Sequence, residues 1–308
     1  MLPKMPPREG QVGFLYCPPY RVQGISVAGE QTCVQIPELD VCFDIGMCPR
    51  VALASPYVAL SHAHMDHIGG LPYYFSQRHF QKMGTGTCFC HPDIEEPLHN
   101  MMRSWVALEQ QQTPYEIVPL ADGEQHEVKP NIFLRAMEVS HTVPAMGYAL
   151  VEKRSKLREE FHGLPQDRLR SLKEAGEQIT KTLEIPLVAY TGDTEFGPFL
   201  YRDEFAMAKV VISECTFFEA DQRSRSSVGK HLHADDIVKL LDIWQAEHIV
   251  LVHASRRTHL GTSREEFVRL VGEERAQRVH FLMDFRANRA RYEEQRAAVE
   301  TTAASTGS

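Results

Sequence analysis

The segment SHAHMDHIGG is the sequence feature that most constrains this chain, because it places three histidines and one aspartate within six residues. These residues are His62, His64, Asp66 and His67. Imidazole nitrogens and carboxylate oxygens together form a ligand set that Zn²⁺ and Mn²⁺ accept. A short apolar strand is predicted just before the segment and a helix just after it, so the four side chains are expected in a loop at a strand end. Such a loop can direct alternate side chains at two neighbouring ions.

Four side chains cannot complete two coordination spheres, so this hypothesis requires further ligands downstream. Three candidates each follow an apolar, strand-like run: His141 in VSHTVP, Asp193 in YTGDTEF and His253 in LVHASRR. Loops at strand ends are where layered folds gather their ligands. The other histidines lack this context, and we expect them on the surface or in the core.

The pattern of apolar runs predicts one large layered α/β domain with appendages. Strands are expected near 25–29, 32–36 and 41–45, and after residue 186 short strands alternate with helices. With 43% apolar residues, a chain of 308 residues can bury a sizeable core. Its longest apolar runs are a handful of residues, whereas a membrane span needs roughly 20, so no membrane association is expected.

Charge distinguishes one internal segment from the rest of the chain. Residues 152–184 concentrate lysine and arginine in a polar stretch that we expect to be a helical, basic insertion. The chain as a whole has a formal net charge of −8, which argues against a protein that coats nucleic acid by bulk charge.

The two ends carry weaker signals. We expect residues 1–20 to be an N-terminal extension and residues 286–308 to be a polar, frayed tail. The N-terminus lacks the charged-then-apolar order of a secretory signal, which predicts a cytoplasmic location. Seven cysteines without a C-x-x-C pair predict reduced thiols.

The combination of these motifs resembles a known family. SHAHMDHIGGLP, preceded by FDIG at 43–46 and followed by His141, TGDT at 191–194 and His253, resembles the metallo-β-lactamase superfamily. Within it, the sequence is similar to the short, plant-like form of ribonuclease Z, the tRNA 3′-processing endonucleases. The similarity runs from about Arg21 to Phe285 and includes SECTF at 213–217.

This resemblance implies a four-layer αββα sandwich, the metallo-β-lactamase fold, over residues 21–285, with two divalent metal ions, zinc or alternatively manganese. It implies that His62, His64 and His141 hold one ion, that Asp66, His67 and His253 hold the other, and that Asp193 bridges them. A hydroxide held between the two ions would then attack phosphorus to cut the 3′ trailer from precursor tRNA. Asp66 would also orient that hydroxide.

The resemblance implies further roles outside the ligand set. Glu214-Cys215-Thr216 and His231 match elements of ribonuclease Z, so His231 would be the general acid and Glu214 its orienting partner. Thr216, Ser255 and Arg257 would contact the substrate. The sequence departs from the family pattern at Lys230, where glycine is usual, and in HASRRT at 253–258, which lacks an aromatic residue after the last ligand.

The family acts as a homodimer on precursor tRNA, which the resemblance implies for this chain as well. The alternative is a small-molecule or cyclic phosphodiesterase of the same superfamily, since a metal site alone does not set substrate size. A β-lactamase is disfavoured because His67 directly follows Asp66. A catalytically silent RNA-binding protein would be expected to have lost ligands, and none is lost here.

Overall fold

Two seven-stranded sheets form the centre of the molecule. The computed structural model describes residues 3–8 and 11–306. Sheet A contains β1 (Gly13–Cys17), β2 (Tyr20–Val27), β3 (Gln31–Ile36), β4 (Val41–Phe43), β5 (Tyr57–Ala59), β6 (Thr87–Cys90) and β7 (Glu116–Pro119). Sheet B contains β8 (Gln125–Lys129), β9 (Ile132–Val139), β10 (Ala145–Leu157), β11 (Thr180–Tyr190), β12 (Val210–Glu214), β13 (His248–Val252) and β14 (Val279–Phe281).

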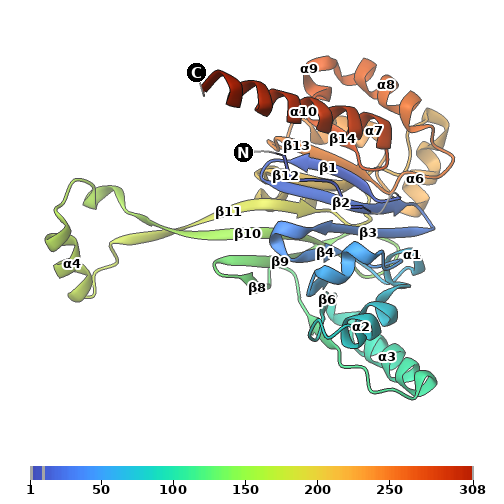
Figure 1. The fold of residues 1–308 in the computed structure, drawn as a ribbon, viewed down its shortest axis with the longest axis horizontal. Helices are drawn as coiled ribbons and strands as arrows, with labels where there is room; N and C mark the ends of the chain where they lie inside the picture. Colours follow the sequence, from blue (N-terminus) through green and yellow to red (C-terminus); the bar gives the residue numbers. More distant parts are fainter. Residues whose placement is uncertain (1–2, 9–10, 307–308) are drawn as a thin grey trace.

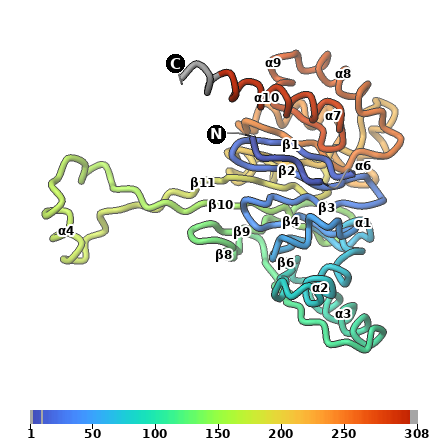
Figure 2. Tube along the Cα trace, viewed as in Figure 1, coloured from blue at the N-terminus to red at the C-terminus, as the bar shows by residue number. Residues whose placement is uncertain are grey.

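The two sheets follow the same plan. In each, the first four strands are antiparallel neighbours and the last four are parallel neighbours. The chain completes sheet A before it enters sheet B, as the colour gradient of Figure 2 shows. The helices are α1 (Met65–Ile68), α2 (Leu71–Phe80), α3 (Glu95–Glu109), α4 (Gln166–Glu174), α5 (Asp203–Ala206), α6 (Arg223–Gly229), α7 (Ala234–Leu240), α8 (Leu260–Val271), α9 (Glu273–Ala276) and α10 (Phe285–Thr306).

Three apolar clusters define four layers. The central cluster lies between the sheets, where the rings of Phe43 and Tyr190 stack with centroids 4.9 Å apart. A second cluster packs α2 and α3 on the outer face of sheet A, and a third packs α5, α7 and α8 on the outer face of sheet B (Figure 1). Burial on both sides of each sheet explains why the parallel strands are continuous apolar runs. The αββα sandwich expected from the sequence is confirmed.

The segment 152–184 differs from the expected helical insertion. β10 and β11 continue as an antiparallel ribbon far beyond sheet B, with register pairs from Glu152↔Ile185 to Leu157↔Thr180. A 3₁₀ helix (Glu159–Phe161) and the short helix α4 lie at its tip (Figure 1). We call residues 152–184 the arm. The prediction of helix was wrong for most of the arm, because a ribbon exposed on both faces has no apolar alternation to reveal its strands.

Both chain ends contain regular secondary structure. Strand β1 lies inside the segment assigned to an N-terminal extension, of which residues 1–2 and 9–10 lie outside the described residues. The segment after residue 285 is the helix α10 and not a frayed tail; residues 307–308 lie outside the described part. Helix α10 is held because the ring of Tyr292 packs edge-on against Phe14, with centroids 5.6 Å apart, and Gln295 Nε2 donates to the Tyr16 carbonyl at 3.0 Å.

Two further features concern the chain as a whole. Among the described helices, none combines the length and the apolar composition needed to cross a bilayer. Six of the seven cysteines are buried, and Cys48 is half-buried.

Candidate metal centre

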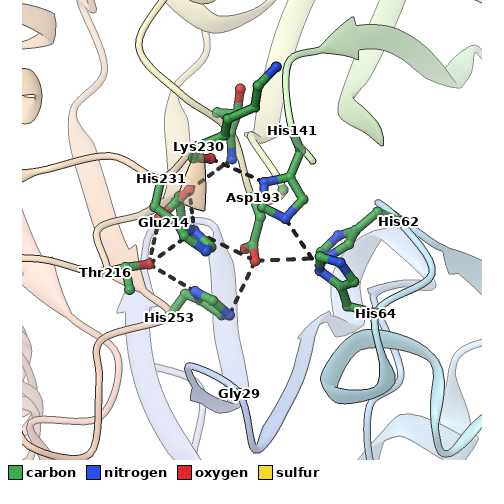
Figure 3. A network of polar contacts seen from close by, with 12 residues as sticks. Gly29, His62, His64, His141, Asp193, Glu214, Thr216, Lys230, His231 and His253 are labelled. Atoms are coloured by element: carbon green, nitrogen blue, oxygen red, sulfur yellow. Dashed lines mark hydrogen bonds and ion pairs between the residues drawn. The ribbon is translucent and has the colours of Figure 1, made fainter. Parts of the chain in front are cut away.

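All seven predicted ligands meet at one edge of the sandwich, where several strands end. His62 and His64 follow β5, and α1 carries Asp66 and His67. The other three follow strands of sheet B: His141 after β9, Asp193 after β11 and His253 after β13. These three strands run in the same direction, because β10 is antiparallel to both β9 and β11 and β11 to β13 are parallel. Their carboxyl ends therefore open on the same edge (Figure 3).

The FDIG segment positions α1 and its two ligands. The Ile45 N–H donates to the His67 carbonyl at 2.7 Å, and the Gly70 N–H donates to the Ile45 carbonyl at 2.8 Å. Gly46 lies so close to α1 that a Cβ atom there would come 1.7 Å from the Asp66 carbonyl oxygen. Only glycine permits this approach, so Gly46 determines where Asp66 and His67 lie.

The ligand atoms form two adjoining groups. In the first, His62 Nε2 lies 2.9 Å from His64 Nδ1, which lies 3.3 Å from His141 Nε2. In the second, His253 Nε2 lies 3.3 Å from both His67 Nε2 and Asp66 Oδ2. Both groups are among the His and Asp clusters able to hold a metal ion.

These spacings fit metal coordination. Ligand atoms around a tetrahedral zinc, with bonds of about 2.0–2.1 Å, lie about 3.3 Å apart. A cation between two imidazole nitrogens would be bound by the lone pairs of both rings. The residues present therefore fit two divalent cations.

Asp193 lies between the two groups. Its Oδ2 is 3.8 Å from His62 Nε2 and 3.3 Å from both His67 Nε2 and His253 Nε2. Its Oδ1 is buried and has no hydrogen-bond partner among the described residues. Burial alone would raise the pKa of Asp193, but His253 and His67 hold it well below its usual range, so the carboxylate is ionised. A buried carboxylate with one free oxygen is suited to bridge two cations.

Asp44, in the FDIG segment, has a role at the site that was not expected from the sequence. Its Oδ2 lies 2.7 Å from His67 Nδ1 and accepts from Ser61 Oγ at 2.8 Å and from the Tyr190 hydroxyl at 2.6 Å. Its Oδ1 accepts from the Ser61 N–H at 2.6 Å. A carboxylate behind a ligating histidine fixes the tautomer that leaves Nε2 free for the metal. An aspartate directly after a strand, two residues before Gly46, is the sequence signal that could have indicated it.

Glu214, Thr216 and His231 form a second layer beside the ligands (Figure 3). Glu214 Oε1 lies 3.0 Å from His231 Nδ1, and Glu214 Oε2 accepts from Thr216 Oγ1 at 2.6 Å. The same Oγ1 lies 2.9 Å from His253 Nδ1. Thr216 is only 5% exposed, so its hydroxyl orients His253 and Glu214 from beneath the site. The expectation that Thr216 touches substrate has no support in this position.

Electrostatics divides the histidines of the site into two kinds. Burial lowers the pKa of His62 to about 2, despite the opposing Asp193 carboxylate, so this imidazole is neutral as metal ligation requires. Burial also lowers the pKa of His231, but the Glu214 and Asp193 carboxylates outweigh it and raise that pKa to about 9. Burial lowers the pKa of His67 as well, but the carboxylates of Asp193 and Asp44 outweigh it and raise that pKa well above its usual value, so a raised pKa is shared by His231 and one ligand.

The remaining predicted residues lie at the rim. Ser255 is half-buried and Arg257 is exposed on the turn after His253, where the Arg257 N–H donates to Ser255 Oγ at 3.3 Å. Lys230 has φ +52°, in the left-handed region that favours glycine, and its carbonyl lies 3.1 Å from His141 Nδ1. The departure from glycine at position 230 thus directly adjoins a ligand.

Comparisons with known proteins agree with this architecture. The family of the β-lactamase superfamily domain matches residues 52–254. A chloroplastic tRNase Z of Arabidopsis thaliana is 33% identical over 271 residues, which cover 87% of this chain and 77% of that relative. A second tRNase Z of the same plant is 31% identical over 242 residues, 77% of this chain and 86% of that relative.

Solved structures show the same fold. Human short-form tRNase Z superposes with a TM-score of 0.57 at 15% identity, covering 89% of this chain and 96% of the human one. The metallo-β-lactamase fold protein YhfI from Bacillus subtilis gives a TM-score of 0.58 at 15% identity, covering 88% and 95%.

Proposed function

This chain belongs to the tRNase Z family of the β-lactamase superfamily, and on that premise we propose that it is a metal-dependent endoribonuclease that removes the 3′ trailer of precursor tRNA. One observation carries the proposal beyond the superfamily: the pair formed by His231 and Glu214 lies directly against a seven-residue ligand cluster. The ligand cluster alone would suit any metal-dependent hydrolase. A proton donor held beside it suits a phosphodiester whose leaving oxygen must be protonated.

We infer that His62, His64 and His141 would hold one cation and that Asp66, His67 and His253 would hold the other, with Asp193 shared. Zinc is the ion we favour, since imidazole and carboxylate suit it, and manganese is the second candidate. When bound, two such cations lower the pKa of water and offset the charge on phosphoryl oxygens. Gly29, whose N–H donates to Asp66 Oδ2 at 2.8 Å, helps to aim that carboxylate.

His231 is the residue we assign to protonate the departing 3′ oxygen. With its Nδ1 proton donated to Glu214, the transferable proton is the one on Nε2. The ring is 17% exposed, so it is held firmly yet is reachable by substrate. Arg257, and with it Ser255, would meet the RNA backbone at the rim, where an exposed guanidinium is suited to a phosphate.

We also infer that the chain forms a homodimer. Large apolar side chains stand exposed on α1 and on the two helices that cover sheet A: Met65 of α1 (81%), Tyr73 and Phe80 of α2 (52% and 76%), and Leu108 of α3 (75%). Exposed apolar side chains of this size are suited to a protein interface. Sedimentation equilibrium should give twice the monomer mass, and Phe80→Glu should shift the protein towards the monomer.

The cleavage reaction itself is the decisive test. Protein loaded with Zn²⁺ or Mn²⁺ is incubated with a 3′-extended precursor tRNA, and the cut is mapped to the nucleotide. We expect a single cut directly after the discriminator base. His64→Ala should abolish it, whereas the matched control His79→Ala, which changes an exposed histidine of α2, should not.

The same preparation separates the alternative function. A protein that hydrolyses a small or cyclic phosphodiester but leaves precursor tRNA uncut would be a small-molecule phosphodiesterase, and the endonuclease proposal would be rejected.

A further inference from the structure

A cavity of about 620 Å³ adjoins the candidate metal centre on the side of His141. Its lining includes residues 138–145, which connect β9 to β10, together with Phe199 and Arg202 from the segment that follows the Asp193 loop. His141 belongs both to this lining and to the ligand cluster, so the cavity begins where the cluster ends. None of the roles assigned above uses this space.

The walls of the cavity combine apolar and polar groups. Val139, Val143, Pro144 and Ala145 line it, and the half-buried ring of Phe199 adds an aromatic face. The polar groups are the hydroxyls of Ser140 and Thr142, the Glu138 carboxylate, His141, and the ion pair between Arg202 Nη1 and Asp122 Oδ1 at 2.6 Å. A mixed wall with one aromatic face and several hydrogen-bonding groups can contact a flat, polar ring by stacking and by hydrogen bonds at its edge.

The charges at the cavity disfavour an anion. The guanidinium of Arg202 is already paired with Asp122 and lies 3.5 Å from Glu204 Oε2, and Glu138 adds an exposed carboxylate to the lining. A phosphate would meet this surplus of negative charge, whereas a neutral aromatic ring bearing amino groups could stack on Phe199 and donate to the Asp122 carboxylate.

A cation lies beside the wall of the cavity. Lys230 Nζ lies 3.1 Å from Ser140 Oγ and 3.2 Å from Glu195 Oε1, while its carbonyl lies at His141. Ser140 lines the cavity, so the ammonium lies next to that part of the wall. An RNA strand offers the matching order of groups, because each neutral base is joined to its neighbour by a charged phosphate.

We propose that this cavity binds the nucleobase of a nucleotide that flanks the scissile phosphate, with Phe199 as the stacking surface and the Arg202–Asp122 pair at the base edge. This proposal rests on the proposed function and assigns a specificity subsite to it.

The test uses precursor tRNAs in which an abasic site replaces either nucleotide beside the cut. At one of these positions the abasic substitution should lower kcat/KM of the wild-type protein by about tenfold, the effect expected for the loss of one stacked base. Phe199→Ala should lower kcat/KM on intact RNA by a similar factor. Phe199→Ala on that abasic RNA should show little further loss, because both changes remove the same contact.

Two controls make the outcome specific. Tyr201→Ala removes an exposed aromatic side chain from the same 3₁₀ helix (Pro198–Tyr201) without touching the cavity, and it should leave kcat/KM unchanged. Turnover of p-nitrophenyl methyl phosphate, which carries no base, should be equal in wild type and Phe199→Ala. Since Phe199 also packs on the core, Phe199→Leu serves as the variant that keeps apolar volume and loses the stacking ring.

The possible failures are distinguishable. If wild type cuts intact precursor tRNA but neither abasic site slows the cut, the cavity proposal is overturned and the proposed function stands. If the losses from Phe199→Ala and the abasic site multiply fully, they arise from separate contacts, which also overturns it. A wild-type protein that does not cut precursor tRNA refutes both.

Discussion

Replacing Asp44 with asparagine tests how the protein prepares a ligand it would offer to a metal. In the wild-type chain, Asp44 Oδ2 faces three donors: His67 Nδ1, Ser61 Oγ and the Tyr190 hydroxyl. Asparagine keeps the shape but replaces one oxygen with an NH₂ group. If that group faces the three donors, the hydroxyls can rotate and accept, but His67 Nδ1 can accept only by moving its proton to Nε2. Nε2 is the atom that must bind the cation.

The opposite orientation also has a cost, because the NH₂ group then faces the Ser61 N–H that Oδ1 accepts in the wild type. One buried donor without an acceptor costs about 1–3 kcal/mol, so the free energy of unfolding of the metal-free chain should fall by that amount. Loss of a carboxylate behind a ligating histidine should weaken metal affinity about 10–100-fold, or about 1.4–2.7 kcal/mol.

Both quantities are measurable on the same protein. Competition with a chromogenic chelator gives the zinc affinity, and urea denaturation of the metal-free chain gives the free energy of unfolding. Asp40→Asn is the matched control, since the Asp40 side chain is 40% exposed and its Oδ2 pairs with Lys129 Nζ at 2.9 Å, away from the metal centre. If Asp44→Asn binds zinc as tightly as wild type, the proposed role of Asp44 in fixing the His67 tautomer is refuted.

Three further predictions follow from other parts of the structure. Gly46→Ala should lower the free energy of unfolding by about 1–3 kcal/mol and weaken zinc binding, because its Cβ would meet the Asp66 carbonyl. Gly261→Ala, with open space around it, should do neither. Equal behaviour of the two variants would contradict the proposed positioning of α1 by Gly46. His231→Ala should lower kcat for RNA cleavage about 100-fold or more, with RNA affinity in a filter-binding assay nearly unchanged; equal losses in both would remove its assignment as proton donor. Burial raises the pKa of Glu38, but the Arg21 N–H, Lys4 and the Arg21 side chain outweigh it and lower that pKa. The ionised Glu38 carboxylate therefore stabilises the folded chain fully above the unfolded pKa of about 4.3, and this stabilisation is lost as pH falls through the lower folded pKa. Glu38→Gln should therefore cost about 1–3 kcal/mol in urea denaturation at pH 7 and much less at pH 3, and a pH-independent gap would speak against the ionised carboxylate.

The ligand positions could be predicted from sequence because each depends on a local rule. A dense His/Asp motif in a strand-end loop, and single His or Asp residues after apolar strands, are visible one segment at a time. The topology then brings those strand ends to one edge, so residues as distant as Asp66 and His253 come within 3.3 Å. The four-layer sandwich was expected on different grounds, namely the resemblance of the motifs to a known family.

The parts that sequence did not reveal depend on contacts between distant segments. Asp44 gains its role only because Tyr190 and His67 lie against it, and Thr216 proves to be buried because Glu214 and His253 cover it. The arm was misassigned because its strands project away from any core. Helix α10 was missed because its order comes from docking on β1 and not from its own polar sequence.

The order in which the chain builds its two sheets has a consequence for the lifetime of the protein. His62, His64, Asp66 and His67 come from the half that forms sheet A, and His141, Asp193 and His253 come from the half that forms sheet B. Cations bound by both halves would add their binding free energy to the docking of one half on the other. In a cell short of metal, the enzyme would lose its activity. The interface between the halves would also open more often and expose the chain to proteases, so the amount of enzyme would fall as well.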